Sequence, residues 1–322
     1  MKYIIHISGL SKQFKLRGNT NVLTGLLAPR WKYKDAVDDI SFAIEPGEAV
    51  AFLGPNGAGK TTTTKMLTGL MKSSSGSIKV LGYDPFQRNH TFLRKIGLVM
   101  GNKAGLNWDL TAQQSFELLQ KIYEVPPEIH AKRIQDLSKM LSVDTLLTTQ
   151  VRKLSLGERM KLELIGSLLH NPDVLFLDEP TIGLDIDSKN NVREFLRSIH
   201  KQGKTILLTS HDMDDVSAVC DRVIVINKGK IMFDGSMSNL NKQYSDKKFI
   251  SLEFEGEVPQ KEQLEQYGTY IKGKKNRITL SVSQGDVMDT VAVIGKNFSV
   301  RDITIEAVPL DVIVNDLYKT EH

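Results

Sequence analysis

The sequence lacks the features that mark membrane-spanning, secreted and zinc-binding proteins. Its single cysteine, Cys220, excludes an intrachain disulfide framework, and no cysteine and histidine cluster has the spacing of zinc ligands. The longest apolar runs, such as 174–177 and 206–208, are far shorter than the roughly 18 to 20 residues that cross a bilayer. The first six residues hold no apolar signal region that leads to a small-residue cleavage site. We therefore expect a cytosolic globular protein.

A large excess of one charge is also missing. The 42 basic and 38 acidic side chains leave a formal net charge of +4, which is too small to argue for nucleic-acid binding by itself. We predict no nucleic-acid partner. The length of 322 residues corresponds to about two domains at roughly 150 residues each.

Up to about residue 235, short apolar runs rich in branched residues alternate with helical patterns. The runs that we interpret as buried strands are Ala49–Leu53, Ile96–Met100, Val174–Leu177, Thr205–Thr209 and Arg222–Ile226. Segment 188–203 has helical apolar spacing and ends on a glycine, which predicts an amphipathic helix. Segment 102–150 is predicted to be mainly helical, with a break at Pro126-Pro127. This alternation predicts an α/β fold with a mostly parallel sheet.

After Gly235 the pattern becomes that of a small α+β domain. We predict strands at 249–254, 277–282 and 300–308, and helices at 260–267 and 287–294. The predicted domains are therefore 1–235 and 236–322.

A phosphate-binding loop follows the first predicted strand. Residues 54–61 fit the pattern G-x-x-x-x-G-K-[ST] and precede a helical stretch at 61–70. Glycines let backbone N–H groups surround phosphate oxygens, and the helix N-terminus adds partial positive charge. Lys60 is expected to reach the β- and γ-phosphates, and the Thr61 hydroxyl to bind Mg²⁺. The predicted nucleotide-binding residues are Gly54, Pro55, Asn56, Gly57, Ala58, Gly59, Lys60, Thr61 and Thr62.

Two carboxylates end the predicted strand at 174–177. Asp178 and Glu179 have the arrangement expected of a Walker B element, in which the first acid positions Mg²⁺ and the second polarises the attacking water. An acidic pair at a strand end can also be a solvated turn. Because a phosphate-binding loop is present in the same chain, we interpret Asp178 as a metal ligand and Glu179 as a catalytic residue.

A further motif points to one family. Residues 154–158 read Leu-Ser-Leu-Gly-Glu and begin an apolar-periodic helix, with Gly157 lying 21 positions before Asp178. This motif resembles the signature sequence of ATP-binding cassette (ABC) ATPases, in a variant with leucine third and glutamate fifth.

Three more segments resemble motifs of the same family. Residues 180–185, which end on Asp185, resemble its D-loop, and His211 resembles its switch histidine. Phe14 stands where the family usually stacks an aromatic ring on adenine. The resemblance covers roughly residues 2–235. Details of segments 10–34, 100–103 and 154–160 are similar to the ATPase subunits of ABC-2-type bacterial exporters.

The resemblance implies a P-loop ABC ATPase cassette with a helical subdomain at about 102–170. It also implies ATP and Mg²⁺ as cofactors, ATP hydrolysis, and a catalytic role for His211 at the γ-phosphate. Two copies are expected to form a homodimer in which ATP on Lys60 of one copy is capped by the signature of the other. The signature residues with this role are Ser155, Leu156, Gly157 and Glu158.

The same resemblance implies integral membrane permease subunits as partners and a peripheral location at the cytoplasmic face of a bacterial cell membrane. The alternatives are a soluble ABC ATPase that acts on ribosomes or DNA and an importer ATPase. The soluble relatives generally carry two cassettes, a long coiled-coil insertion or zinc motifs, and this sequence has none of them.

Asn102 is one departure from the family pattern. The family usually has glutamine after the strand at 96–100, where it reaches the metal and the water. Asn102 is shorter by one methylene. We predict that Asn102 takes this place and binds the metal through a water molecule, and a weakened role is the alternative.

Two other segments allow two interpretations. Segment 10–34 carries six basic and no acidic residues, together with Leu26, Leu27 and Trp31, so it is either a solvated basic hairpin or a loop that contacts anionic lipid. Apolar residues at 108, 110 and 116 form either a groove for a permease helix or the core of the helical subdomain.

Overall fold

The computed structural model describes residues 2–17, 31–101, 105–242, 244–256 and 258–319. The chain divides into two compact units, Met1–Asp234 and Gly235–His322. This division lies one residue before the predicted domain boundary. The predicted positions at 18–30 and at Asn102 lie outside the described residues.

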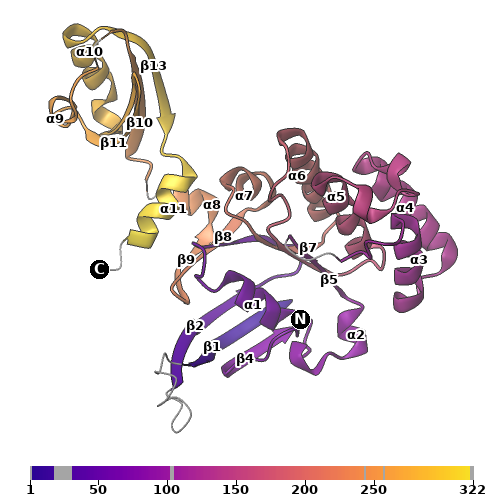
Figure 1. Cartoon of the computed structure of the whole chain (residues 1–322). Helices are drawn as coiled ribbons and strands as arrows, with labels where there is room; N and C mark the ends of the chain where they lie inside the picture. Colours follow the sequence, from indigo (N-terminus) through magenta and orange to yellow (C-terminus); the bar gives the residue numbers. More distant parts are fainter. Residues whose placement is uncertain (1, 18–30, 102–104, 243, 257, 320–322) are drawn as a thin grey trace, which may run out of the picture. The chain divides into compact units, whose positions relative to one another are not determined.

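The first unit is built on a six-stranded sheet with the order β5-β6-β7-β3-β8-β9 (Figure 1). Its strands are β3 (Ala49–Leu53), β5 (Ile96–Met100), β6 (Val174–Asp178), β7 (Thr205–Thr209), β8 (Arg222–Asn227) and β9 (Lys230–Ser236). The strands from β5 to β8 pair in parallel, and every residue of β3, β6 and β7 is buried. Fully buried parallel strands need the continuous apolar runs seen in the sequence. The five strands predicted for this region are confirmed.

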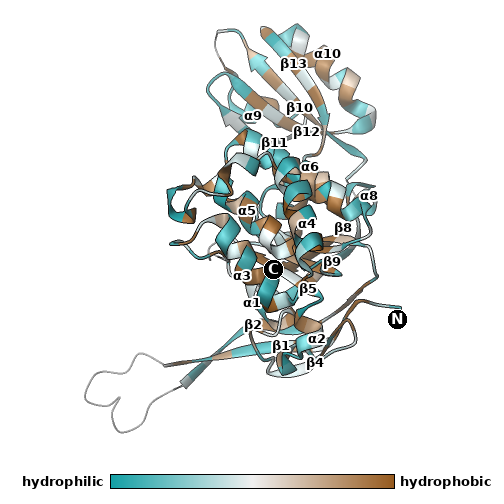
Figure 2. Ribbon diagram, turned by 90° about the vertical axis from the view of Figure 1, so that its right-hand side faces the viewer, coloured by the Kyte–Doolittle hydropathy of each residue, from teal (hydrophilic) through white to brown (hydrophobic). Residues whose placement is uncertain are grey.

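A second, antiparallel sheet has the order β2-β1-β4. It consists of β1 (Ile5–Arg17), β2 (Trp31–Ile44) and β4 (Ser75–Val80). Figure 2 shows the outer part of the β1 and β2 hairpin as mostly hydrophilic and projecting from this unit, whereas inner residues such as Ile5 and Ile44 are buried. Phe14 pairs with Lys34 in the register of the hairpin, so the two side chains lie on one face of it. The described ends of segment 10–34 therefore form paired strands.

Seven helices of the first unit are described. They are α1 (Lys60–Leu67), α2 (His90–Leu93), α3 (Ala112–Tyr123), α4 (Pro127–Met140), α5 (Leu156–Leu168), α6 (Ile186–Lys201) and α7 (Met213–Val219). The break predicted at Pro126-Pro127 separates α3 from α4, where proline at the first helical position costs no hydrogen bond. Phe116 on α3 is fully buried, so it belongs to the core of the helical segment. In the described part of the chain, no helix is long and apolar enough to span a membrane.

The second unit contains a four-stranded antiparallel sheet with the order β11-β12-β10-β13. Its strands are β10 (Lys247–Phe254), β11 (Thr269–Lys274), β12 (Arg277–Ser283) and β13 (Val300–Ala307). Its helices are α8 (Met237–Lys242), α9 (Lys261–Leu264), α10 (Val287–Asn297) and α11 (Leu310–Lys319). Leu252, Leu280 and Ile294 pack in one apolar cluster beneath the sheet.

The sequence prediction for this unit missed three of its described elements. The helix predicted at 260–267 is only the single turn α9, because the chain turns at 265–268 and enters β11. β11 is an edge strand with mostly exposed side chains, so it has no apolar alternation to reveal it. Helices α8 and α11 were also not predicted.

Candidate functional site

The phosphate-binding loop connects β3 to α1 and requires glycine at two positions for steric reasons. A Cβ atom on Gly54 would lie 2.3 Å from the carbonyl oxygen of Ile226, and one on Gly59 would lie 2.5 Å from that of Ala36. Gly59 also has φ of 114°, which side chains other than glycine rarely allow. The N-terminus of α1 has no side-chain cap, so its N–H groups are available to an anion.

Lys60 is folded inside this loop. Its Nζ donates to the carbonyl oxygen of Gly54 at 2.6 Å and to that of Pro55 at 3.3 Å, and the side chain is nearly buried. Burial lowers the pKa of the Lys60 ammonium, and the nearby carboxylates of Glu179 and Asp178 oppose that shift. A desolvated cation among backbone carbonyls is suited to bind phosphate oxygens.

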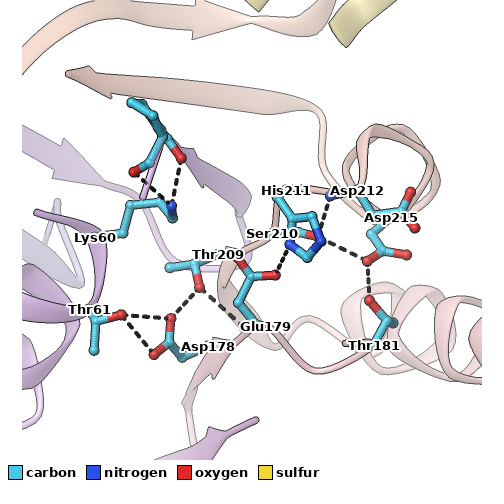
Figure 3. Close-up of polar contacts among 12 residues, drawn as sticks. Lys60, Thr61, Asp178, Glu179, Thr181, Thr209, Ser210, His211, Asp212 and Asp215 are labelled. Atoms are coloured by element: carbon cyan, nitrogen blue, oxygen red, sulfur yellow. Dashed lines mark hydrogen bonds and ion pairs between the residues drawn. The ribbon is translucent and has the colours of Figure 1, made fainter. Parts of the chain in front are cut away.

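Thr61 and Asp178 bring oxygen ligands together at the end of the central sheet. Thr61 Oγ1 lies 3.1 Å from Asp178 Oδ2, and Thr209 Oγ1 donates to Asp178 Oδ1 at 2.5 Å (Figure 3). Asp178 and Thr209 are register partners in the parallel pair β6 and β7, so both side chains emerge at the carboxyl edge. The sequence analysis did not identify Thr209, although its place at the end of a predicted parallel strand is a signal for it.

Glu179 and His211 contact each other beside this carboxylate. Glu179 Oε2 lies 2.6 Å from Nδ1 of His211. The Glu179 backbone has φ of 55° and donates its N–H to the backbone oxygen of Thr209 at 3.0 Å. A left-handed backbone at a residue other than glycine stores strain, which is common in active sites. The His211 side chain is 63% exposed, so it is accessible to a ligand from outside the chain.

The phosphate loop, the acidic pair and His211 line one cavity of about 800 Å³. Its lining joins the loop residues 54–57 and 59–62 to Asp178, Glu179 and His211, and it includes Phe14, Leu16 and Lys34 from the hairpin. The structure thus gathers Phe14, the phosphate loop, the acidic pair and the histidine in one place. Ala58 is buried beside the cavity and does not line it. Sequence reasoning missed Leu16 and Lys34.

The signature segment lies apart from this cavity. None of residues 155–158 belongs to the cavity lining. Ser155 caps α5 in a reciprocal arrangement, with the Ser155 N–H donating to Glu158 Oε2 at 2.8 Å and Ser155 Oγ accepting from the Glu158 N–H at 3.3 Å. Ser155 is exposed, and Gly157 is buried against Ser188. One chain therefore does not bring its own signature to its own phosphate loop.

Asp185, the last residue of the segment that resembles a D-loop, is the N-cap of helix α6. Its carboxylate accepts from the N–H of Ser188 at 2.9 Å at the start of α6. That hydrogen bond lowers the pKa of Asp185. Asp185 does not line the cavity, whereas Ile182 from the same segment does.

Comparison with known proteins decides the family. The chain is 38% identical over 209 residues to the ABC transporter ATP-binding protein NatA of Bacillus subtilis (strain 168). The matched region covers 65% of this chain and 85% of that protein. The chain belongs to the ABC transporter ATP-binding protein family. The ABC transporter family model matches residues 37–182, and the model of an EvrA-like ABC transporter C-terminal domain matches residues 246–306.

Other comparisons agree with this family. The Nod factor export ATP-binding protein I of Ralstonia nicotianae (strain ATCC BAA-1114 / GMI1000) is 34% identical over 66% of this chain and 66% of that protein. A solved ATP-binding subunit of an ABC transporter superposes with a TM-score of 0.63 at 24% identity and covers 75% of this chain and 93% of its own. That structural likeness supports the α/β cassette fold. As an ABC transporter ATP-binding protein, the chain binds nucleotide and hydrolyses ATP in a reaction coupled to transport. The alternative of a soluble ATPase that acts on ribosomes or DNA is not favoured.

The cassette has a second cavity, of about 440 Å³, between β5 and helices α3 and α5. Apolar side chains line much of it, including Leu98, Leu119 and Ile122, together with the carboxylate of Glu163. Burial raises the pKa of Glu163 to about 7, while the N–H of Gly105 and the charge of Arg159 oppose that shift. The residues at 108, 110 and 116, which the sequence offered as a groove, do not line this cavity.

Proposed function

We propose that this chain is the nucleotide-binding subunit of an ABC exporter. The contact between Glu179 and His211 beside the phosphate loop carries the catalytic part of the proposal. Two relatives support the direction of transport, because their names describe Nod factor export and linearmycin resistance. An exporter accounts for these names better than the importer alternative.

Mg²⁺ fits the oxygen pair formed by Thr61 and Asp178. A hydroxyl and a carboxylate face each other at 3.1 Å next to the loop, and Mg²⁺ binds through one or two such protein oxygens together with phosphates and water. The described residues contain no cluster of three or more acidic, histidine or cysteine side chains that could hold a metal alone, so the remaining ligands would come from nucleotide and water. The ion would supply positive charge that stabilises the phosphate oxygens.

Glu179 and His211 would act on the attacking water. The Glu179 carboxylate would accept a proton from the water as the water oxygen bonds to the γ-phosphorus. The bond between the γ-phosphorus and the β–γ bridging oxygen breaks in the same step, which releases ADP and phosphate. His211 orients Glu179 through the 2.6 Å contact and is exposed enough to meet the γ-phosphate. Lys60 and the N–H groups of α1 stabilise the phosphate charge. Phe14 would stack on the adenine, and the hairpin places it in the same cavity.

A homodimer would complete the site. Residues 155–158 lie outside the cavity of their own chain, so a second copy is the natural source of the signature. At the N-terminus of α5 the capping box already bonds the N–H groups of Ser155 and Glu158. The helix dipole and the N–H groups of Leu156 and Gly157 are what this end would offer to a γ-phosphate. Asp185 and its neighbours would lie in the interface by the resemblance to the D-loop. A solved cassette of the same fold is described as a dimer bound to ADP and Pi, at 23% identity and a TM-score of 0.62, covering 72% of this chain and 98% of its own.

Permease subunits would bind at the cytoplasmic face of the membrane. The second cavity suits a permease helix, because apolar side chains line much of it and charged side chains such as Glu163 and Arg94 are also in its lining. Contact of segment 10–34 with anionic lipid is a further part of the proposal, supported by the half-exposed Trp31 and by Lys15, whose Nζ lies 4.3 Å from the Trp31 ring centroid. Vesicle flotation that is independent of anionic lipid would exclude that contact.

The Glu179→Gln variant tests the catalytic proposal. We expect it to bind ATP and to accumulate as a dimer, because the site still closes around the nucleotide while the water is no longer activated. Size-exclusion chromatography with ATP measures the dimer, and phosphate release measures hydrolysis. Hydrolysis at the wild-type rate would overturn the assignment of Glu179.

Affinity purification from gently solubilised native membranes tests the partner proposal. Mass spectrometry should recover a polytopic membrane protein with the tagged chain. A matched purification of a Leu119→Asp variant should lose that protein while it keeps ATP binding, because the new charge lies in the second cavity. Recovery of ribosomal or DNA-bound proteins in place of a permease would contradict the transporter assignment.

A further inference from the structure

Asp215 is a buried carboxylate on α7, four positions after His211. Its side chain is only 2% exposed. It accepts hydrogen bonds from the hydroxyl of Thr181 and, at 2.9 Å, from the hydroxyl of Ser210 (Figure 3). Nε of Arg193 is a third donor, at 2.6 Å. Burying a carboxylate is costly unless its oxygens are paired, so these donors explain how the fold tolerates it.

The two hydroxyl donors belong to the segments that carry the catalytic pair. Thr181 lies two residues after Glu179, and Ser210 immediately precedes His211. Glu179 and His211 contact each other directly. These contacts form a closed ring. Asp215 links Thr181 to Ser210 on one side, and the contact between Glu179 and His211 closes the ring on the other side.

Arg193 on α6 fixes the orientation of this carboxylate. It binds Asp215 Oδ1, which leaves Oδ2 for both hydroxyls. Nη2 of Arg193 also lies 3.2 Å from Asp212 Oδ1, and Nζ of Lys189 lies 2.6 Å from Asp212 Oδ2. The Arg193 side chain is 15% exposed, so these ion pairs are screened less than surface pairs. The arginine is thus held from two sides.

We propose that Asp215, held by Arg193, is a positioning residue for ATP hydrolysis that keeps the Glu179 and His211 segments in register. Asp215 does not line the nucleotide cavity, so it acts only through those segments. The inference rests on the proposed function, because Asp215 affects hydrolysis only if Glu179 and His211 activate the water. Thr181 also belongs to the D-loop-like segment, so a partner subunit in contact with that segment would act on the same ring.

The first test is the Asp215→Asn variant. Asparagine keeps the shape of the side chain, but it has one acceptor oxygen and an amide donor, which cannot satisfy the donors of Thr181, Ser210 and Arg193 together. We expect kcat to fall by roughly tenfold, because small displacements of catalytic groups are costly. The KM for ATP and the affinity for ATP without Mg²⁺ should stay within about twofold, since the phosphate loop is untouched.

Asp214→Asn is the matched control. It removes the same charge from the same helix, but the Asp214 side chain is 84% exposed and lies 3.9 Å from Arg193. We expect kcat to remain at the wild-type value. If Asp215→Asn does not fold, Thr181→Val removes one donor with little change of shape, and Thr181→Ser restores the hydroxyl. The proposal is supported if Thr181→Val loses kcat and Thr181→Ser keeps it. Equal kcat values in Thr181→Val and Thr181→Ser contradict the proposal.

A double-mutant cycle separates positioning from a purely structural role. In a His211→Ala background the ring is already open, so adding Asp215→Asn should lower the residual kcat by less than about twofold. A further tenfold loss would show that Asp215 acts elsewhere and would overturn the inference. If Glu179→Gln and His211→Ala hydrolyse ATP normally, the proposed function fails. If those two variants are impaired and Asp215→Asn is not, only the inference about Asp215 fails.

Discussion

Thr61 and Asp178 face each other at the start of α1 and the end of β6, with Thr61 Oγ1 3.1 Å from Asp178 Oδ2. The two residues are 117 positions apart in the chain. Thr209 orients the same carboxylate by donating to its other oxygen at 2.5 Å. The pair therefore presents two oxygen ligands in a fixed arrangement next to the phosphate loop.

The Asp178→Asn variant tests these ligands. An amide oxygen is a weaker ligand for Mg²⁺ than a carboxylate, so we expect a higher Mg²⁺ concentration for half-maximal hydrolysis and a loss of kcat on the order of a hundredfold. Steady-state phosphate release across a Mg²⁺ titration measures both. Asp173→Asn is the control, because Asp173 stands just before the other end of β6 and its carboxylate lies 3.6 Å from Nζ of Lys95. An unchanged Mg²⁺ dependence in Asp178→Asn would exclude it as a ligand.

Substitution of two loop glycines by alanine should have unequal effects on stability. Gly57 and Gly59 both have positive φ, at 82° and 114°, so each substitution costs about 1 to 2 kcal/mol of backbone strain. A Cβ on Gly59 also lies 2.5 Å from the Ala36 oxygen, whereas one on Gly57 meets nothing within 4 Å. We expect Gly59→Ala to lose roughly 1 to 3 kcal/mol more free energy of unfolding. Urea denaturation measures the difference, and equal losses would contradict the steric argument.

The Glu163 carboxyl should make stability depend on pH. Burial raises its pKa from 4.5 to about 7, so the folded state holds this proton more tightly than the unfolded state. Between pH 4.5 and 7 the folded state binds more protons, and the free energy of unfolding therefore falls as pH rises, by about 3 kcal/mol from this group. Glu163→Gln should remove that part of the slope. Urea denaturation at pH 5 and pH 8 measures it.

The exposed residue Glu117 on α3 supplies the control for this prediction, because Glu117→Gln also removes one carboxylate from the helical segment. The advantage of Glu163→Gln over the wild type should grow from pH 5 to pH 8. An advantage that is the same at both pH values would contradict the link between Glu163 burial and stability.

Asn102 stays a prediction from the sequence, because it lies outside the described residues. If it reaches the metal through a water molecule, Asn102→Gln adds one methylene and replaces that water with a direct contact. We expect a changed metal dependence of ATP hydrolysis. An unchanged ATPase rate and an unchanged metal dependence would argue against any catalytic role at this position.

Much of the fold and of the nucleotide site could be predicted from local sequence. The run from Gly54 to Thr61 specifies a phosphate loop because its glycines meet steric needs within a single turn. The apolar runs of β3, β6 and β7 indicate buried parallel strands, because both faces of such strands are covered. Asp178 and Glu179 are evident because they end one of those runs. In the second unit, edge strand β11 has no comparable pattern and was missed.

The sequence by itself determined the family, the phosphate loop and the acidic pair, since each is encoded by residues that are close together in the chain. Only the tertiary structure decided which distant side chains support them. Thr209 reaches Asp178 because β6 and β7 are parallel and in register. Asp215 accepts from Arg193 because α7 packs beside α6, and it accepts from Thr181, 34 positions earlier in the chain. Hydrogen bonds between distant residues depend on how the strands and helices pack, which local patterns do not specify.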